Sequence, residues 1–334
     1  MDGKVRNIVK NFLKGNLRCV EFAVTNACIA KCSFCGIWKQ QPKVFVDKTK
    51  ALEAIDKLAD LGVGHMTLTG GEPLLHPDIV EFVRRASRHN INNSVLVAAP
   101  QLLSRKDTAA RLADAGADMI SVSFDSEDPE ICARQRQIEN IMGLMEDGID
   151  AAKRAGLRLM ASVLIWKGNC DRLETLFDKA LALGFDFIAV NYPTFSESST
   201  YSLGGEGIDI PHSKVKESLE TVIRLKRAGR HPIINTVHSM RNILNYLDDP
   251  PTAKFPCLGG NRVLFVDWFF DVYPCMQLPD SLGKVFDMDE RALSMPMCNK
   301  CNMSWYRDIS VFFHGMRSAP LIFEAIASSG KYLT

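Results

Sequence analysis

The chain has 334 residues, 40 basic and 39 acidic side chains, and a formal net charge of +1. This near-neutral balance gives no whole-molecule reason to expect a nucleic acid or an anionic membrane as a partner. The sequence has no apolar run of about 18 residues, the length that a membrane-spanning helix needs. The first ten residues, MDGKVRNIVK, lack the apolar core of a signal peptide. We therefore expect a cytoplasmic protein, in which ten cysteines indicate metal binding or catalysis rather than disulfides.

Residues 1–17 are expected to form a separate amphipathic helix at the start of the chain. Five apolar residues fall on one helical face of the segment 5–15, namely Val5, Ile8, Val9, Phe12 and Leu13. Such a helix is typical of packing against a larger body. The alternative is a helix that lies on a membrane surface and delivers a lipid substrate.

Between residues 18 and 247, short apolar runs alternate with helical patterns six times. The expected strands cover residues 18–24, 65–70, 92–99, 119–124, 157–165 and 187–193. The expected helices cover residues 48–62, 77–90, 105–116, 148–156, 172–184 and 213–229. Apolar strands that alternate with helices are typical of a parallel sheet covered by helices. Six units are too few for a closed eight-stranded barrel, so the sequence predicts an α/β fold with a partial (β/α)6 TIM-like barrel.

The pattern changes near DDPPTAK at residues 248–254, a proline-rich stretch that suits a linker. Short strands joined by Gly, Pro and Asp turns follow, and a helix is expected to close the chain. We therefore expect residues 248–334 to form a small C-terminal α+β module.

The segment NACIAKCSFCGIW, residues 26–38, contains Cys28, Cys32 and Cys35 in a C-x3-C-x2-C pattern directly after the first expected strand. Loops that follow parallel strands line the active face of such folds. Thiolates favour iron–sulfur clusters or zinc. Three thiolates on a four-iron cube leave one iron open, so a substrate or cofactor would complete its coordination.

This loop resembles the cluster motif of the radical S-adenosylmethionine (SAM) enzymes, and TGGEP at residues 69–73 resembles the GGE motif of that family. The resemblance implies a 4Fe-4S cluster whose open iron binds SAM, and reductive cleavage of SAM to a 5′-deoxyadenosyl radical. It also implies cofactor contacts for a set of named residues: Gly70, Gly71 and Glu72 with the methionine amino group, Phe34 with the adenine, and Ser123, Asp125 and Ser162 with other parts of SAM. For Ser123 and Asp125 a helix cap or turn is the alternative.

Four further cysteines, Cys257, Cys275, Cys298 and Cys301, fall in the C-terminal module. Four thiolates close a cluster completely, which indicates electron transfer or structure. CLGGNRVLFVDWFFDVYPC resembles the opening of the SPASM/twitch extensions of radical SAM enzymes, although Phe270 stands where they usually have glycine. The resemblance implies one auxiliary 4Fe-4S cluster of the twitch type, and a four-cysteine zinc site is the alternative.

Cys170 follows the fifth expected strand. A thiol at this edge of the sheet would be placed to donate a hydrogen atom to a substrate radical, and a bystander cysteine is the alternative interpretation.

We therefore expect a radical SAM oxidoreductase, isomerase or lyase acting on a sugar, aminocyclitol or nucleoside-like metabolite, with a reductant such as flavodoxin or ferredoxin. Ribosomal peptides and lipids are the alternative substrates. The expected barrel begins by residue 18, so we expect no N-terminal leader-binding domain, which disfavours the peptide. A non-enzymatic metal-binding or electron-relay protein is the remaining alternative, although such a protein has no use for an ammonium pocket at GGEP.

Overall fold

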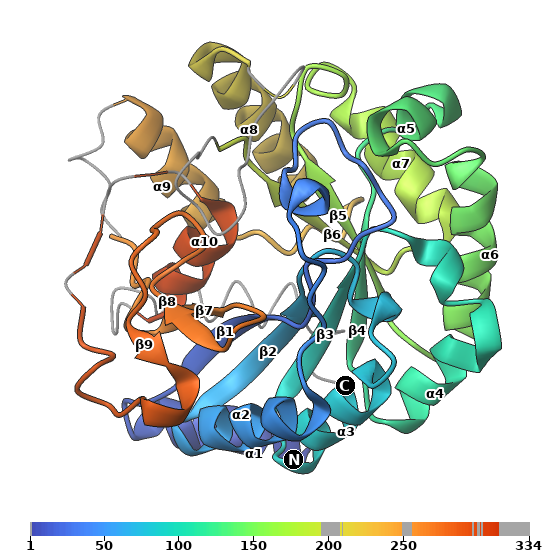
Figure 1. The fold of residues 1–334 in the computed structure, drawn as a ribbon. Helices are drawn as coiled ribbons and strands as arrows, with labels where there is room; N and C mark the ends of the chain where they lie inside the picture. The colour runs from blue at the N-terminus through green and yellow to red at the C-terminus, as the bar shows by residue number, and fades with distance from the viewer. Residues whose placement is uncertain are drawn as a thin grey trace.

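The computed structural model describes residues 2–194, 208, 210–248, 256–295, 297–298, 301 and 303–313. A curved parallel sheet lies at its centre, with helices along the outer face (Figure 1). All six strands expected in the barrel are present: β1 (Arg18–Ala23), β2 (Val63–Thr69), β3 (Asn92–Val97), β4 (Met119–Ser123), β5 (Leu159–Leu164) and β6 (Phe187–Asn191).

The strands are arranged in the order β6-β5-β4-β3-β2-β1-β7-β8-β9. Every pair from β1 to β6 is parallel, which confirms the partial barrel. β7 (Val263–Val266) extends the same sheet in parallel with β1, and β8 (Asp271–Tyr273) and β9 (Gly283–Lys284) follow antiparallel. The expected short C-terminal strands therefore continue the barrel sheet.

The six expected barrel helices are also present: α2 (Lys48–Asp60), α3 (Ile79–Arg88), α4 (Thr108–Asp114), α6 (Ile141–Arg154), α7 (Leu173–Leu183) and α8 (His212–Arg227). The sequence did not predict α5 (Pro129–Arg136) or α9 (Val237–Asp248). Single turns of 3-10 helix occur at Ile37–Lys39, Pro73–Leu75, Pro100–Leu102, Arg105–Asp107 and Val285–Asp287. The expected module boundary at 248–254 lies, apart from Asp248, outside the described residues, so the division into domains stays a prediction.

The N-terminal helix, α1 (Gly3–Leu13), packs at the lower edge of the barrel, near the start of β2 (Figure 1). Lys4 Nζ forms an ion pair with Asp118 at 2.6 Å and also donates to the Gly116 carbonyl oxygen at 2.9 Å. These contacts fit the packing interpretation of this helix, although Leu13 at its end stays 79% exposed. Among the described residues, no helix is both long and apolar enough to cross a membrane.

Side chains alternate between the two faces of each barrel strand. Apolar side chains such as Val20, Phe22, Met66 and Leu68 are fully buried on one face. The residues between them, such as Glu21 and Thr67, line cavities inside the barrel. Because successive strand residues point to opposite faces, the helices cover an apolar surface and the barrel encloses a polar interior.

The last described helix, α10 (Ser304–Phe312), lies beside β7 at the open edge of the barrel (Figure 1). Tyr306 donates a hydrogen bond of 2.7 Å to Glu21 on β1, and Ser304 donates one of 3.0 Å to Asn191 on β6. α10 therefore bridges the first and last barrel strands, which do not pair with each other.

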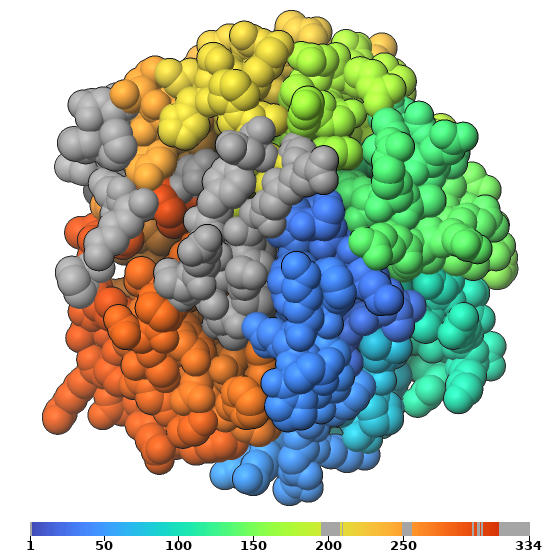
Figure 2. Space-filling model, turned by 45° about the horizontal axis from the view of Figure 1, so that its top comes forward, coloured from blue at the N-terminus to red at the C-terminus, as the bar shows by residue number. Residues whose placement is uncertain are grey.

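Segments far apart in the sequence meet on the face of the molecule shown in Figure 2. The blue region that contains α2 lies against the orange region that contains the turn Val285–Asp287. The early barrel and the C-terminal strands thus share one packed surface.

Candidate active site

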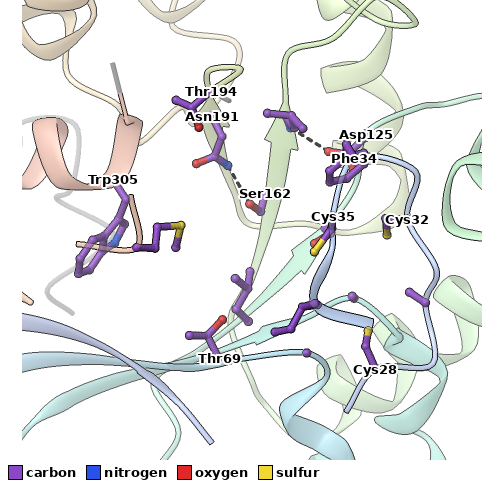
Figure 3. Close-up of a pocket in the computed structure, with 18 of the residues that line it drawn as sticks. Cys28, Cys32, Phe34, Cys35, Thr69, Asp125, Ser162, Asn191, Thr194 and Trp305 are labelled. Carbon is purple, nitrogen blue, oxygen red and sulfur yellow. Dashed lines mark hydrogen bonds between the residues drawn. The ribbon is translucent and has the colours of Figure 1, made fainter. Parts of the chain in front are cut away.

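A cavity of about 270 Å³ opens at the carboxyl ends of the barrel strands. Cys28, Cys32 and Cys35 lie together on one side of it, and Trp305 lies across from them (Figure 3). Ser162 and Asn191 lie between these two sides. The cavity therefore joins the cysteine loop after β1 to α10 near the end of the described chain.

The cysteine loop is held by side-chain hydrogen bonds of Thr25 and Asn26, which lie just after β1. Thr25 Oγ1 donates to the Val44 carbonyl oxygen at 2.6 Å, and Asn26 Oδ1 accepts from the Val44 amide at 2.7 Å. Trp38 Nε1 donates to the Cys32 carbonyl oxygen at 3.1 Å and ties the loop to its own last turn. These contacts fold the segment back on itself and fix the three thiols at the cavity wall.

All ten cysteines are thiols in the structure. Burial raises the pKa of Cys28 to about 12 and that of Cys35 to about 11, so these groups are protonated without a metal. The Arg136 guanidinium donates to a thiol of the loop, with 3.7 Å between Nη1 and Cys32 Sγ. Iron would displace the protons, because coordination deprotonates a thiol outright.

The loop fits a cluster with three protein ligands. Its thiols are close together, because charge on Cys32 would raise the pKa of both Cys28 and Cys35, and all three line one cavity. Within the described chain, no three Cys, His, Asp or Glu side chains converge as ligands of a single metal ion. Thiolates that share a four-iron cube stand farther apart than ligands of one ion, and soft sulfur ligands suit iron–sulfur clusters.

Gly70 and Gly71 form a close contact between the ends of β1 and β2. A Cβ atom on Gly70 would lie 2.1 Å from the Thr25 carbonyl oxygen, and one on Gly71 would lie 2.2 Å from the Ala27 carbonyl oxygen. Gly70 also has a φ of +127°, which L side chains rarely adopt. Both glycines line the cavity, and their contact with the methionine amino group stays a prediction.

Glu72 does not line the cavity among the described residues. Its side chain is fully buried, and Oε1 accepts from the Leu74 amide at 3.0 Å. Oε2 accepts from the amides of Ala98 and Ala99 at 2.8 and 2.7 Å. The Glu72 carboxylate therefore connects the loops after β2 and β3, and its contact with the methionine amino group stays a prediction.

Asp125 lines the cavity, but its carboxylate is committed to protein partners. One oxygen pairs with the Arg136 guanidinium, and the other accepts from the Leu164 amide at 2.8 Å. Burial raises the pKa of Asp125, and the charge of Arg136 opposes that shift. The main-chain oxygen of Asp125 accepts from Trp166 Nε1 and Asn169 Nδ2, so this residue organises the ends of β4 and β5.

The other predicted SAM contacts also lie at the cavity. Phe34, Ser123 and Ser162 line it, and the Ser162 hydroxyl accepts from Asn191 Nδ2 at 2.9 Å. The structure therefore brings these residues together with the cysteines, and their contacts with SAM stay predictions.

Cys170 does not line the cavity among the described residues. Its thiol lies 3.9 Å from the Lys167 carbonyl oxygen, and its charged neighbours are Asp171 and Lys214. The structure therefore does not bring Cys170 together with the cavity residues, and its role as a hydrogen donor stays a prediction.

The four C-terminal cysteines come from three segments that meet beside α10. Cys257 and Cys298 exchange two backbone hydrogen bonds of 2.8 and 2.9 Å. Charge on Cys301 would raise the pKa of both Cys257 and Cys275, which shows that these thiols are near one another. Arg307, 1% exposed, donates to the Cys301 carbonyl oxygen. The donor set fits a closed cluster with four thiolates.

Several cavity residues were missed from the sequence. Arg136 belongs to α5, a short helix without clear apolar periodicity, and Glu21 stands in a strand that otherwise reads as apolar. Trp305 and Tyr306 come from α10, whose place in the barrel no local pattern indicates. Glu21 is the single acidic residue within β1, and this was the one signal in the sequence for a polar group that faces the barrel interior.

The fold and the cysteine geometry define a class of metal-dependent enzyme in which three thiolates leave one iron open. The family model described as "Radical SAM superfamily" matches residues 22–180. The chain is 30% identical to GTP 3',8-cyclase of Helicobacter pylori over 313 residues, which cover 86% of this chain and 92% of that protein. The chain belongs to the radical SAM superfamily, and its family cofactors are a 4Fe-4S cluster and SAM.

The chain is similar to two further proteins of known name or structure. PqqA peptide cyclase of Granulibacter bethesdensis is 29% identical over 253 residues, which cover 73% of this chain and 63% of that protein. The crystal structure of Streptococcus suis SuiB bound to S-adenosylmethionine matches with a TM-score of 0.63 at 14% identity, over 81% of this chain and 64% of that one. The second likeness confirms the fold.

Proposed function

We propose that this chain abstracts a hydrogen atom from a small polar metabolite, such as a sugar, an aminocyclitol or a nucleoside. One observation carries the proposal: the three thiols lie on one side of a cavity that the glycine pair also lines, and polar and aromatic side chains line the rest of it. Trp305 lies across from the thiols, and Ser162 and Asn191 lie between them. The cavity thus offers a place for SAM beside a place for a second molecule.

When bound, the cluster and SAM supply an electron and a 5′-deoxyadenosyl radical, while the protein orients the reactants and excludes water. Gly70 and Gly71 bring the β2 backbone within reach of an ammonium group. Asp125 and Arg136 hold the loops after β4 and the cysteine loop in one arrangement. Trp305 and Tyr192 give the cavity aromatic walls, which limit the access of water. The net reaction is a dehydrogenation, an epimerisation or an elimination.

The four C-terminal cysteines support the proposal of an auxiliary 4Fe-4S cluster. A cluster with four protein ligands has no open position, so it would transfer electrons or stabilise structure. We assign the external electron to a reductant such as flavodoxin or ferredoxin, and we place the protein in the cytoplasm, where thiols stay reduced.

Oxygen-free reconstitution tests this function. We expect about eight iron and eight sulfide ions per chain for two four-iron clusters, and 5′-deoxyadenosine on reduction with SAM. A panel of deuterated sugars, aminocyclitols and nucleosides, with GTP and a peptide included, would then show which compound transfers deuterium into 5′-deoxyadenosine. Stoichiometric zinc without SAM cleavage would contradict the enzyme, and deuterium transfer from the peptide alone would replace the small-molecule substrate.

A further inference from the structure

The floor of the active-site cavity separates it from a second cavity of about 300 Å³ deeper in the barrel. A set of described residues lines both cavities: Glu21, Leu96, Ser162, Asn191 and Trp305. Glu21 is the one titratable side chain in this set. The floor therefore carries a single acidic group at the place where a second molecule would meet the barrel interior.

The Glu21 carboxylate is 7% exposed and has an incomplete set of partners. Oε2 accepts the Tyr306 hydroxyl at 2.7 Å, and no described residue is a partner for Oε1. Its neighbours across the sheet are Thr67 on β2 and Phe265 on β7, neither of which is charged. Burial raises the pKa of Glu21 to about 7, because no cation compensates the carboxylate. A buried carboxylate without a counter-charge is costly, so a ligand that supplies one would bind favourably.

The groups around Glu21 suit a cation as well. Trp305 and Tyr306 meet edge to face, with ring centroids 5.2 Å apart, and both line the cavity. Aromatic faces attract ammonium groups. The Asn191 side chain is held between Ser162 and Ser304, which fixes a polar wall beside these rings.

The same charges disfavour a nucleoside triphosphate. Among the described cavity residues, Arg136 is the one permanent cation, and it already contacts Asp125 and Cys32. Recognition of phosphates requires arginine, lysine or metal charges that are available to them. The acidic floor at Glu21 would repel a triphosphate, so this cavity differs in charge from what the name GTP 3',8-cyclase would require of a binding site.

We propose that Glu21 is a substrate-binding residue that pairs with a primary ammonium group, so that the substrate of this enzyme is an amine. The inference rests on the proposed function and narrows it to amino sugars and aminocyclitols within the small polar metabolites. A lysine side chain of a peptide presents the same ammonium chemistry, so the experiment distinguishes the two sources. Tyr306 acts as a positioning residue that orients the carboxylate.

The test uses the reconstituted protein with SAM and measures binding by calorimetry. Its probes are a panel of amino sugars and aminocyclitols, their hydroxyl counterparts, GTP and a lysine-containing peptide. We expect amine members to bind more tightly than their hydroxyl counterparts. Glu21→Gln should lower the affinity for amines about 10- to 100-fold, as expected for the loss of a charge-assisted hydrogen bond. Glu21→Gln keeps the size of the side chain and should leave binding of the hydroxyl compounds unchanged.

Asp308→Asn is the matched control. Asp308 is also a buried acid, but it lines the deeper cavity and not the active-site cavity. The Asp308→Asn variant should still bind amines more tightly than hydroxyl compounds, whereas Tyr306→Phe should weaken the binding of amines severalfold. Preference for GTP or for hydroxyl compounds, no binding by any amine, or an equal loss in Asp308→Asn would overturn the inference. Binding of the lysine peptide alone would keep the ammonium site and reject the small-molecule source.

Failure of the proposed function is distinguishable from failure of this inference. Reductive SAM cleavage by the wild-type protein without substrate tests the proposed function alone, because this reaction involves the cysteines and the glycine pair and no bound amine. If the wild-type protein forms no 5′-deoxyadenosine, the proposed function fails. If the wild-type protein forms 5′-deoxyadenosine but Glu21→Gln binds amines as tightly as the wild type does, the inference alone fails.

Discussion

The hydroxyl of Tyr306 donates a 2.7 Å hydrogen bond to the carboxylate of Glu21, which lies 285 residues earlier in the chain. Glu21 precedes the first cysteine loop, and Tyr306 follows Cys301 by five positions. The bond thus ties the last described helix to the first strand of the barrel. It also connects, through two side chains, the neighbourhoods of the two cysteine groups.

Loss of this bond should destabilise the protein. Tyr306→Phe removes the hydroxyl and leaves the buried Glu21 carboxylate without its hydrogen-bond donor, which typically costs about 1–3 kcal/mol. Urea denaturation of the metal-free protein would measure the change in the free energy of unfolding. A Tyr306→Phe variant as stable as the wild type would show that the bond contributes nothing to the fold.

The stability of the metal-free protein should depend on Glu21 and pH. Burial raises the pKa of Glu21 from its ordinary 4.5 to about 7 in the folded state. The unfolded chain therefore releases this proton first, and stability is lost as pH rises from 4.5 through 7. Glu21→Gln removes this loss, so the variant should gain stability relative to the wild type over that interval, by up to about 3 kcal/mol.

Thermal unfolding of both proteins at several pH values measures this difference. Asp308 has a pKa raised by burial in the same way and is present in both proteins, so it cancels in the comparison. If the difference in stability between the wild type and Glu21→Gln is the same from pH 5 to 8, then folding does not raise the pKa of Glu21.

Arg136 and Asp125 form an ion pair in which each side chain is 3% exposed. Arg136→Gln leaves a buried carboxylate without its partner and should cost about 3–5 kcal/mol. The double variant Asp125→Asn, Arg136→Gln removes both charges, so it should recover most of that loss. Equal stability of the single and double variants in urea would contradict the pairing.

The same guanidinium should affect the cluster held by the cysteine loop. Arg136 donates to Cys32 Sγ at 3.7 Å, and hydrogen bonds to cluster sulfurs are among the features that set reduction potentials. Removal of this donor should lower the midpoint potential of the cluster in the double variant, which retains the fold. Redox titration followed by electron paramagnetic resonance measures it, and an unchanged potential would exclude this influence.

Phe270 occupies a backbone conformation that favours glycine, with a φ of +66°. Its ring is nonetheless buried and lies 6.1 Å from Phe22 and 5.3 Å from Phe286, centroid to centroid. Phe270→Ala loses the packing and keeps the strain, whereas Phe270→Gly loses the packing and relieves the strain. Both should be less stable than wild type, but the glycine variant should exceed the alanine variant by about 1 kcal/mol. If denaturation shows that Phe270→Ala is more stable than Phe270→Gly, this would contradict the positive φ at residue 270.

Local patterns were sufficient to predict the barrel and the first cysteine loop. Each of the six strands is a short apolar run, and the spacing of Cys28, Cys32 and Cys35 directly after the first strand predicts a cluster site. The departure at Phe270 from the usual glycine was visible in the sequence, and the positive φ explains why glycine is the usual residue there.

Contacts between distant segments escaped prediction. The direction of Glu72 depends on the amides of Ala98 and Ala99, which directly follow β3. Arg136 reaches Cys32 only because α5 packs behind the cysteine loop, where the Lys31 amide donates to the Arg136 carbonyl oxygen at 2.9 Å. Side-chain direction in such cases is a property of the assembled sheet and loops, and no periodicity in one segment encodes it.

Formation of 5′-deoxyadenosine by single cysteine variants tests the central claim most directly. After oxygen-free reconstitution and reduction, the wild-type protein should cleave SAM, and alanine at Cys28, Cys32 or Cys35 should abolish cleavage while the iron bound by the C-terminal cysteines remains. If any of these three variants forms 5′-deoxyadenosine at the wild-type rate, then the cluster at the first loop does not perform the chemistry.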